Sequence, residues 1–441
     1  MNGQQGTPRI AVVGAGSGGI CAAKNLIAAG VDVTVFEIGS KIGGMWVYEN
    51  DSGRSSAYSS LRINSEQRVT AYPDYPFPDG TPIYPGHELV AAYLKSYADH
   101  FGVTERVQFN SEVTRIEDAG DGKWRIRLAN GDESVWDGVV VSPGHQAEPH
   151  HPDFHEDFAG EYLHVHHYRT PGSFAGKRVL VVGMGNSALD VGADLAKVAK
   201  SVELVARSPV LILPRDIFGR PLPRILRKVE RPWMPWEMKR RIRVGLSAIA
   251  YGSMESYGLK TPKTRTHGTM QPAILDFVAD GRVSFRPGIK SVDGQKVAFE
   301  DGGCGEYDVM IAATGYEVDL PFLPEDVVRV QNRKPDLYLR MFAPEHPGLY
   351  FVGYFNNAAG SNISLMDLQG RALAKLVAGE ATLPSPSEMR EAIEAEVEDQ
   401  KRLFPDRSRY GLELDPVPYR EAIEAFMTGT ADDLSKRRIF R

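Results

Sequence analysis

The sequence predicts an α/β fold with two buried parallel sheets, and two similar stretches of chain carry this prediction. Each stretch has an apolar run typical of a strand buried on both faces, followed by a glycine-rich turn, a helix and a second strand. The first stretch covers residues 9–37 and the second covers 177–207. A chain of 441 residues is also long enough for roughly two or three domains. We therefore expect two Rossmann-like dinucleotide-binding domains.

The first glycine-rich turn has a pattern that can hold the pyrophosphate of a dinucleotide. Residues 14–19 read Gly-Ala-Gly-Ser-Gly-Gly and precede a predicted helix over 22–29. Such glycines let the backbone amides of a helix N-terminus approach the pyrophosphate. Glu37 ends the predicted strand 31–37, where a carboxylate can accept hydrogen bonds from ribose hydroxyls. We interpret this turn as an FAD site formed by Gly14, Gly16, Ser17, Gly18, Gly19 and Glu37.

The second motif differs from the first in two informative features, because its turn ends in Ala188 rather than in a glycine and its following strand ends in a different type of residue. It reads Gly-Met-Gly-Asn-Ser-Ala over 183–188, and the predicted strand 201–207 ends in Arg207 rather than in an acid. An acid there would repel a 2′-phosphate, whereas a guanidinium can bind it in bidentate fashion. NADPH is therefore favoured over NADH, although Arg207 as a plain surface charge stays open. The predicted NADPH residues of this turn are Gly183, Gly185, Asn186, Ser187, Ala188 and Arg207.

Other segments indicate how the two domains share the chain. Between the turns, 108–141 shows alternating strands broken by Asp-Gly and Asn-Gly, which are strong hairpin signals. Later strands at 308–314 and 349–353 and a helix at 367–378 would return the chain to the first domain. We expect a discontinuous FAD domain, 1–165 plus 310–441. An NADPH domain, 166–309, would be inserted in it and carry a helical insertion around 215–270.

That insertion contains a basic segment rich in tryptophan and methionine. Residues 224–251 hold eight Lys or Arg and only two Glu. One interpretation is a helix that binds a membrane surface or gates substrate entry. The interpretation we favour is a helical insertion packed on the NADPH domain, with its basic face in water.

Composition excludes several other classes of protein. A net charge of −6 argues against a chain built to coat nucleic acid. The two cysteines, Cys21 and Cys304, provide no disulfide framework, redox pair or cysteine zinc site within one chain, so a reducing cytoplasm fits best. No apolar stretch reaches the roughly 18 residues of a membrane span. The sequence allows a homodimer.

Two dinucleotide units in one chain imply hydride transfer from a nicotinamide to a flavin. A disulfide reductase would need a pair of neighbouring cysteines, which this sequence lacks. Molecular oxygen is therefore the expected electron acceptor. We also expect a small-molecule substrate as a partner.

At this point the sequence resembles the flavin-containing monooxygenase family, the class B flavoprotein monooxygenases, and in particular a soluble bacterial-type member. Residues 158–168, Phe-Ala-Gly-Glu-Tyr-Leu-His-Val-His-His-Tyr, match the family fingerprint F-x-G-x-x-x-H-x-x-x-Y/F and lie just before the second turn, as in the family. Residues 43–46, 58–65, 73–78, 183–188 and 313–316 are also similar. The resemblance spans nearly the whole chain.

The resemblance implies further site residues. Gly44, Met45 and Trp46 would lie against the flavin, Val113 near the adenine, and Ser187 to Asp190 along NADP. Asn64, with Ser65, would lie beside flavin and nicotinamide, where its amide can both donate and accept a hydrogen bond. Gln369 and Asp367 match a C-terminal segment that closes over the flavin in similar proteins. This assignment competes with plain polarity of a helix surface, and the family's proline shortly before this run is absent here.

The activity implied is insertion of one oxygen atom into a soft nucleophile, an amine nitrogen or sulfide sulfur, through a C4a-hydroperoxyflavin. NADP⁺ would stay bound and shield that intermediate from water, so the protein needs a dry pocket rather than a side-chain nucleophile or base. Alternatives within the family are Baeyer–Villiger oxidation of a ketone and oxygenation of an indole-type keto acid. Alternatives of other classes are an NADPH oxidase or electron-transfer flavoprotein and a non-catalytic dinucleotide sensor.

Seven of the eleven histidines fall between His145 and His167, which raises the question of a metal site. We expect none. His164 belongs to the fingerprint, the other histidines lack carboxylate or cysteine partners at ligand spacing, and flavin needs no metal to react with oxygen.

Overall fold

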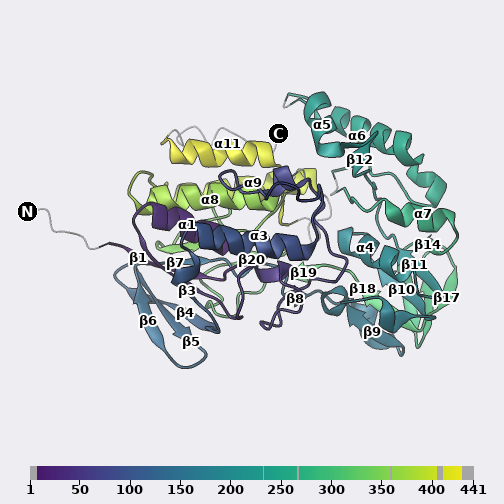
Figure 1. Ribbon diagram of the computed structural model, residues 1–441, viewed down its shortest axis with the longest axis horizontal. Coiled ribbons are helices and arrows are strands. Elements are labelled where there is room, and N and C mark those ends of the chain that lie inside the picture. The colour runs from purple at the N-terminus through teal and green to yellow at the C-terminus, as the bar shows by residue number, and fades with distance from the viewer. Residues whose placement is uncertain (1–6, 232, 266–267, 358–359, 405–410, 430–441) are drawn as a thin grey trace, which may run out of the picture. The chain divides into compact units, whose positions relative to one another are not determined.

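The computed structural model describes residues 7–231, 233–265, 268–357, 360–404 and 411–429 (Figure 1). By its internal contacts the chain forms two compact units. The first comprises Met1–Ser55, Gln67–Glu148 and Glu317–Arg441, and the second comprises Ser56–Glu66 and Pro149–Tyr316. The second unit is thus inserted in the sequence of the first. The α/β class expected from the sequence is confirmed.

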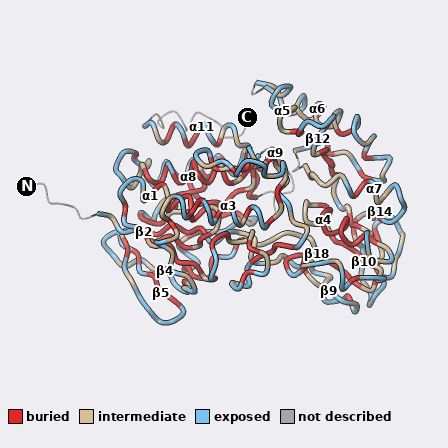
Figure 2. Tube along the Cα trace, in the orientation of Figure 1, coloured by how far each residue is buried: buried red, intermediate tan, exposed pale blue. Residues whose placement is uncertain are grey.

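A five-stranded parallel sheet forms the centre of the first unit. Its strand order is β22 (Leu349–Phe351), β7 (Gly138–Val141), β1 (Arg9–Val13), β2 (Asp32–Phe36) and β3 (Val107–Gln108). Its inner strands are apolar and almost fully buried because they are covered on both faces (Figure 2). The glycine-rich turn lies directly after β1, the central strand of this sheet.

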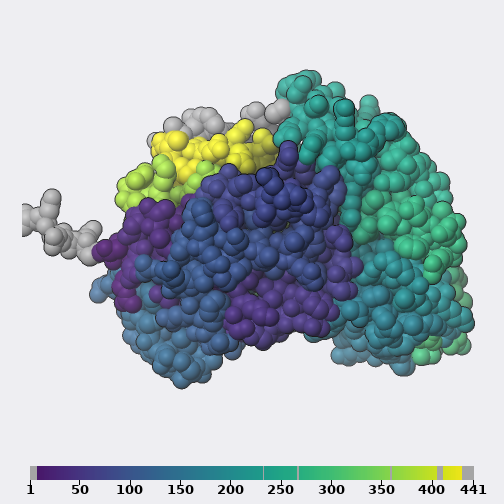
Figure 3. Space-filling view, in the orientation of Figure 1, coloured from purple at the N-terminus to yellow at the C-terminus, as the bar shows by residue number. Residues whose placement is uncertain are grey.

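Helices from both ends of the chain pack together beside this sheet. Helix α1 (Ser17–Ala28) connects β1 to β2 and packs on α8 (Asn362–Val377), which in turn contacts α11 (Pro416–Met427). In Figure 3 the purple N-terminal part and the yellow-green C-terminal part accordingly lie side by side. Within the first unit the C-terminal part of the chain therefore covers the first βαβ motif. The first unit also contains α2 (Gln67–Thr70), α3 (His87–His100) and α9 (Pro386–Leu403).

The predicted antiparallel layer of the first unit is present. Strands β4 (Val113–Gly120), β5 (Lys123–Leu128) and β6 (Glu133–Trp136) pair in order. The Asp-Gly turn between the first two has positive φ at both residues, 53° and 70°. Gly131 in the Asn-Gly turn has a φ of 91°. Both turns therefore use the left-handed conformations that these residues tolerate.

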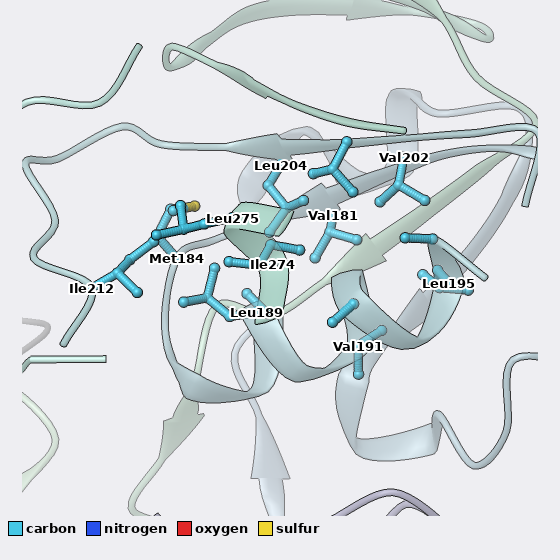
Figure 4. Close-up of a cluster of buried hydrophobic side chains, with 14 of the residues drawn as sticks. Val181, Met184, Leu189, Val191, Leu195, Val202, Leu204, Ile212, Ile274 and Leu275 are labelled. Atoms are coloured by element: carbon cyan, nitrogen blue, oxygen red, sulfur yellow. The ribbon is translucent and has the colours of Figure 1, made fainter. Parts of the chain in front are cut away.

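A second five-stranded parallel sheet forms the centre of the second unit. Its order is β14 (Val283–Arg286), β11 (Ser201–Val205), β10 (Arg178–Val182), β18 (Val309–Ala312) and β9 (Glu161–His164). Helix α4 (Asn186–Leu195) connects β10 to β11. Figure 4 shows its side chains Leu189, Val191 and Leu195 packed with Val181, Val202 and Leu204 of the strands and with α7 (Ala273–Ala279).

Helix α4 is shorter than the sequence predicts. We expect a helix as far as Lys200, but the helix ends at Leu195. Beyond that point the Lys197 amide donates back three residues, to the Asp194 carbonyl, rather than four. The last predicted turn is therefore a tightened helix end.

Two α-helices lie among the described residues of the basic segment 224–251 and its flanks. They are α5 (Leu222–Val229) and α6 (Trp236–Tyr251), preceded by the short hairpin β12 (Asp216–Ile217) and β13 (Arg220–Pro221). Ile225, Leu226, Val244 and Leu246 pack against the buried core of the second unit. Several basic side chains of the segment face solvent, and Trp233 is 73% exposed. These contacts support the interpretation as a packed insertion with a solvated basic face.

A second antiparallel sheet in the second unit was not predicted. It is formed by β15 (Ile289–Asp293), β16 (Lys296–Phe299) and β17 (Cys304–Glu306). Short paired strands complete the described chain: β8 (Glu148–Pro149) with β19 (Tyr316–Glu317), β20 (Val330–Gln331) with β21 (Lys334–Pro335), and β23 (Asn356–Asn357) with β24 (Glu413–Leu414). Among the described residues no helix is long and apolar enough to cross a membrane.

The compact units divide the chain at other points than the domain boundaries predicted at 165/166 and 309/310. Strand β9 pairs with β18 and therefore belongs to the second sheet, although it precedes residue 166. Residues 56–66 also belong to the second unit. How the two cofactor domains divide the chain remains a prediction.

Candidate functional site

The first glycine-rich turn has the geometry of a dinucleotide loop. Gly14 has a φ of 99°, and a Cβ there would lie 2.5 Å from the Ser142 carbonyl oxygen. A Cβ at Gly19 would lie 1.8 Å from the Gly14 carbonyl oxygen, so both glycines are needed for the turn itself. A Cβ at Gly16 would meet only Gly44, at 3.8 Å. The backbone is therefore tightly packed at Gly14 and Gly19, whereas it is open at Gly16.

The start of α1 leaves its backbone amides available for an anion. Its N-cap is Gly16, which has no side chain to cap the amides, and its first turn contains no acidic residue. The first amides of a helix have no partner within the helix, and the helix dipole favours a negative charge there. The start of α1 at Gly16 to Gly19 is therefore open to an anion such as a pyrophosphate, and binding of FAD by these residues remains a prediction.

Glu37 supports this turn from the end of β2. Its Oε2 accepts a hydrogen bond from the Ala15 amide at 2.7 Å, and its Oε1 accepts one from the Gly39 amide at 2.9 Å. Burial raises the pKa of Glu37, and these two amide hydrogen bonds oppose the shift. A carboxylate has about four acceptor positions, so contact with a ribose hydroxyl remains compatible with these bonds. Glu37 therefore shapes the loop in addition to any contact with the cofactor.

A second glycine-containing segment lies against the first turn. The Gly43 amide donates to the Ala15 carbonyl at 3.0 Å, and Gly44 has a φ of 55°. The short helix η1 (Gly44–Trp46) starts here, and both Met45 and Trp46 are half-buried. The structure thus brings Gly44, Met45 and Trp46 to the loop predicted to bind FAD, while their contact with the flavin stays a prediction.

The second glycine-rich turn repeats this geometry in the second unit. Gly183 has a φ of 131°, and a Cβ there would lie 2.5 Å from the Ala313 carbonyl oxygen. A Cβ at Gly185 would meet nothing within 4 Å. Gly185 is the N-cap of α4, again with no side-chain cap and no acid in the first turn. Asn186 Oδ1 accepts from the Met270 amide at 3.1 Å, whereas Ser187 is half-buried and Ala188 is fully buried.

Arg207 follows the carboxyl end of β11 and is exposed. The residue that corresponds to Glu37 after β2 is Ala206, and Arg207 lies one position further along the chain. Ligands of open parallel sheets bind at the carboxyl ends of the strands. The sequence predicts that the strand ends in Arg207, but β11 ends at Val205, two residues earlier, so the arginine lies in the loop after the strand. Its bond to a 2′-phosphate remains a prediction.

Asn64 lies in a bend of the segment 56–66 and is half-buried. Its amide forms no hydrogen bond to another described residue, so its donor and acceptor groups are available to a ligand. Ser65 next to it is also half-buried, and Ile63 before it is buried.

Two predicted cofactor residues are engaged by the protein itself. Asp190 is buried, and its Oδ2 accepts a hydrogen bond from the Tyr58 hydroxyl at 2.5 Å. Gln369 is fully buried, where its Oε1 accepts from the Gly353 amide at 2.9 Å and its Nε2 donates to the Tyr419 hydroxyl at 2.6 Å. Asp367 is buried as well. The alternative that Asp367 and Gln369 are helix-surface polarity is therefore wrong.

Val113 begins β4 and is buried in the core of the first unit. Nothing in this environment tests its predicted position near an adenine.

Several histidine rings of the 145–167 region contact one another, His151 stacked on His155 and edge-to-face with His164. His151 lies 5.1 Å from His155 and 5.6 Å from His164, measured between ring centroids. Among the described residues no group of three or more His, Cys, Asp or Glu side chains is arranged to hold a metal ion.

The residues that sequence reasoning missed are those that hold the segment of Asn64. Tyr58, Ser60 and Glu66 bond to Asp190, Asp194 and Arg224. These partners are more than 100 positions apart in sequence, so no local pattern could have indicated the contacts.

Taken together, two open glycine turns, each at the carboxyl edge of a parallel sheet, define an oxidoreductase with two dinucleotide sites. Comparison with known proteins agrees. Residues 7–436 match the family described as Flavin-binding monooxygenase-like. Flavin-containing monooxygenase 5 of Rattus norvegicus is 31% identical over 94% of this chain and 82% of its own length.

Solved structures show the same architecture. The S-allyl-L-cysteine S-oxygenase of Allium sativum is 27% identical, with a TM-score of 0.73 over 96% of this chain and 89% of its own. A cyclohexanone monooxygenase is 17% identical with a TM-score of 0.69 over 96% of this chain and 98% of its own, a likeness of fold. This chain belongs to the Flavin-binding monooxygenase-like family, whose members are flavin-dependent oxygenases that use FAD and NADPH.

Proposed function

We propose that this enzyme inserts one oxygen atom of O₂ into a soft nucleophile, the sulfur of a sulfide or the nitrogen of an amine, at the expense of NADPH. The observation that carries this proposal is the pair of dinucleotide loops in a chain of the monooxygenase family. Likeness to an S-oxygenase at 27% identity favours sulfur among the substrates. The other oxygen atom leaves as water with the two electrons that NADPH supplies.

The residues present fit both cofactors. The amides of Gly16 to Gly19 would hold the FAD pyrophosphate, and those of Gly185 to Ala188 would hold that of NADPH. Arg207 would bind the 2′-phosphate. When bound, FAD supplies the oxygen-activating chemistry and NADPH supplies the hydride.

Asn64 is the residue we place at the reacting atoms. Its amide can donate and accept a hydrogen bond, but it cannot ionise and so brings no proton to the site. A site that retains activated oxygen benefits from such a group because protons and water favour loss of hydrogen peroxide. Asn64 would therefore orient the reactants without acting as an acid or base.

The nearest rival within the family is Baeyer–Villiger oxidation. An assay of a methyl aryl sulfide and a cyclic ketone, side by side with NADPH and air, separates the two functions. We expect sulfoxide as the major product. Lactone formation at a higher kcat/KM than sulfoxide formation would overturn the substrate class we propose, and indole-type keto acids belong in the same panel.

Two functions of other classes are tested by stoichiometry. An NADPH oxidase would consume NADPH and release all of the oxygen as hydrogen peroxide, whatever substrate is present. A dinucleotide sensor would bind NADPH without consuming it. We expect the yield of hydrogen peroxide to fall as oxygenated product appears.

We also infer a cytoplasmic location from the cysteines. Cys21 is buried, where burial raises the pKa of its thiol, and Cys304 is exposed, both as free thiols. A reducing compartment keeps an exposed thiol from oxidising.

A further inference from the structure

The segment 56–66 carries Asn64 but has almost no regular secondary structure of its own. Within the segment the Leu61 amide donates to the Tyr58 carbonyl at 2.9 Å, and the rest of its shape depends on the surfaces that it contacts. In the second unit these contacts are buried or partly buried hydrogen bonds and one ion pair, and they lie on both sides of Asn64 in the sequence.

The first contacts join the segment to α4. Asp190 and Asp194 are four residues apart and therefore share one face of this helix. Tyr58 Oη donates to Asp190 Oδ2 at 2.5 Å, and Ser60 Oγ donates to Asp194 Oδ2 at 2.5 Å. The amide of Ser59 adds a bond to the Arg169 carbonyl at 2.9 Å.

The last contact joins the segment to the basic insertion. Glu66 is buried, with 2% of its surface exposed, and it receives both arms of the Arg224 guanidinium of α5. The bond from Arg224 Nε to Glu66 Oε2 measures 2.8 Å. Bidentate pairs of this type fix geometry as well as charge.

These acids are unsuited to contact a phosphate directly. Asp190 is 6% exposed, and each of its oxygens already accepts a hydrogen bond, one from Tyr58 and one from the Gln271 amide. Burial raises the pKa of Asp190 although both hydrogen bonds oppose the shift. Keeping two carboxylates buried on one helix face costs stability, and such a cost is usually retained where it serves a site.

We propose that Asp190 and Asp194 are positioning residues that tie the helix after the second glycine turn to the segment that carries Asn64. A dinucleotide held at the start of α4 is then in rigid connection with Asn64, because the helix and the segment share these bonds. This inference rests on the proposed monooxygenase function and on the role given there to Asn64.

The test removes single hydroxyl groups and leaves the side-chain shape. Tyr58→Phe and Ser60→Ala each delete one donor to α4. We expect the amount of sulfoxide formed per NADPH consumed to fall roughly three- to tenfold, with hydrogen peroxide rising in its place. The reason is that Asn64 is no longer held in a fixed position relative to the bound dinucleotide. The KM for NADPH should stay within about twofold, since the glycine turn is untouched.

Tyr307→Phe is the matched control. Tyr307 is buried in the same unit and donates its hydroxyl to a carboxylate, Glu203, outside the segment of Asn64. We expect this variant to form as much sulfoxide per NADPH consumed as the wild type, a ratio we call coupling. A loss of coupling in Tyr307→Phe equal to that in Tyr58→Phe would overturn the proposal, because it would show a general effect of losing a buried bond.

Asp190→Asn separates positioning from direct binding of the cofactor. A positioning residue predicts poor coupling with an unchanged KM for NADPH. A KM raised about tenfold or more with unchanged coupling would assign Asp190 to the cofactor and overturn the proposal.

Hydrogen–deuterium exchange of the holoenzyme gives a measurement that does not depend on the reaction. Peptides covering 56–66 should exchange faster in Tyr58→Phe and Ser60→Ala than in the wild type or Tyr307→Phe. Addition of NADP⁺ should slow their exchange in the wild type. If the wild type forms no oxygenated product but shows these differences, the proposed function fails and the positioning role stands. Equal exchange in all variants overturns the positioning role.

Discussion

Charged residues that follow corresponding strands of the two units carry opposite charges, although Arg207 lies one position further past its strand than Glu37 does. Glu37 follows β2 and Arg207 follows β11, each after the second strand of a βαβ motif. Glu37 is buried and binds two backbone amides of its own unit, whereas Arg207 is exposed. The acid therefore shapes the loop of its own unit, and we propose that the exposed guanidinium binds the 2′-phosphate of NADPH.

Replacement of Arg207 by alanine tests this difference. We expect the KM for NADPH to rise about tenfold or more, because a charge-assisted hydrogen bond is worth about 1.5–3 kcal/mol. The KM for NADH, which has no 2′-phosphate, should change little. Steady-state kinetics with both cofactors at constant ionic strength measures the ratio. Lys290→Ala removes an exposed cation of β15 in the same unit and should leave the ratio unchanged.

At the scale of elements, the sequence predicted those helices, strands and hairpins that are determined by residues close together in the chain. The strands before both glycine turns, the helices after them and the hairpins of β4 to β6 are confirmed, since an apolar run or an Asp-Gly pair acts within a few residues. The sheet of β15 to β17 was missed. The bond between Tyr58 and Asp190 could not be predicted, because it joins a loop without periodicity to a helix 132 positions away.

Helix α9 is held to the first unit by a buried ionic cluster. Glu396 is 5% exposed, and it faces Arg340 Nη2 at 2.8 Å and Lys334 Nζ at 3.3 Å. Burial alone would raise the pKa of Glu396, but the two cations outweigh it and lower the pKa. For the cation Lys334 burial acts in the other direction and lowers the pKa, because burial disfavours its charged form.

Loss of the Glu396 charge should destabilise the first unit strongly. Glu396→Gln leaves two buried cations without their counter-charge, and breaking a buried pair in this way costs about 3–5 kcal/mol. Urea unfolding followed by circular dichroism measures the change. Glu398→Gln makes the same substitution on the same helix at an exposed pair with Lys401, where we expect less than about 1 kcal/mol. Similar losses in both variants would contradict this role of the cluster.

At the scale of the whole molecule, buried histidines link stability to pH. His164 ends β9 and is almost fully buried, with Nδ1 accepting from the His166 amide at 3.1 Å. Burial lowers the pKa of His164 to about 3, and the neighbouring His151 and His166 add to the shift. Burial also lowers the pKa of His145 in the first unit. Both side chains are therefore neutral in the folded protein at pH values where the unfolded chain takes up protons.

The sign of this linkage makes the protein less stable as pH falls. Above an unfolded pKa of about 6.5 both states bind no proton at His164, so its contribution to stability is fully present. Below that value only the unfolded state gains the proton, until the pH approaches 3. Thermal unfolding should therefore show a loss of about 1–2 kcal/mol of stability from His164 between pH 6.5 and 5. Carboxyl groups whose pKa is lowered in the folded protein titrate below this pH window.

His164→Gln isolates this contribution, because an amide oxygen can still accept from the His166 amide but does not titrate in this range. We expect the variant to be less stable than the wild type at pH 7.5 and to lose less of its stability between pH 6.5 and 5. His155→Gln, at a half-buried position of the same unit, should follow the wild-type curve. If the stability of His164→Gln falls with pH as steeply as that of the wild type between pH 6.5 and 5, the acid sensitivity of the molecule arises elsewhere. His145 would then be the next residue to replace.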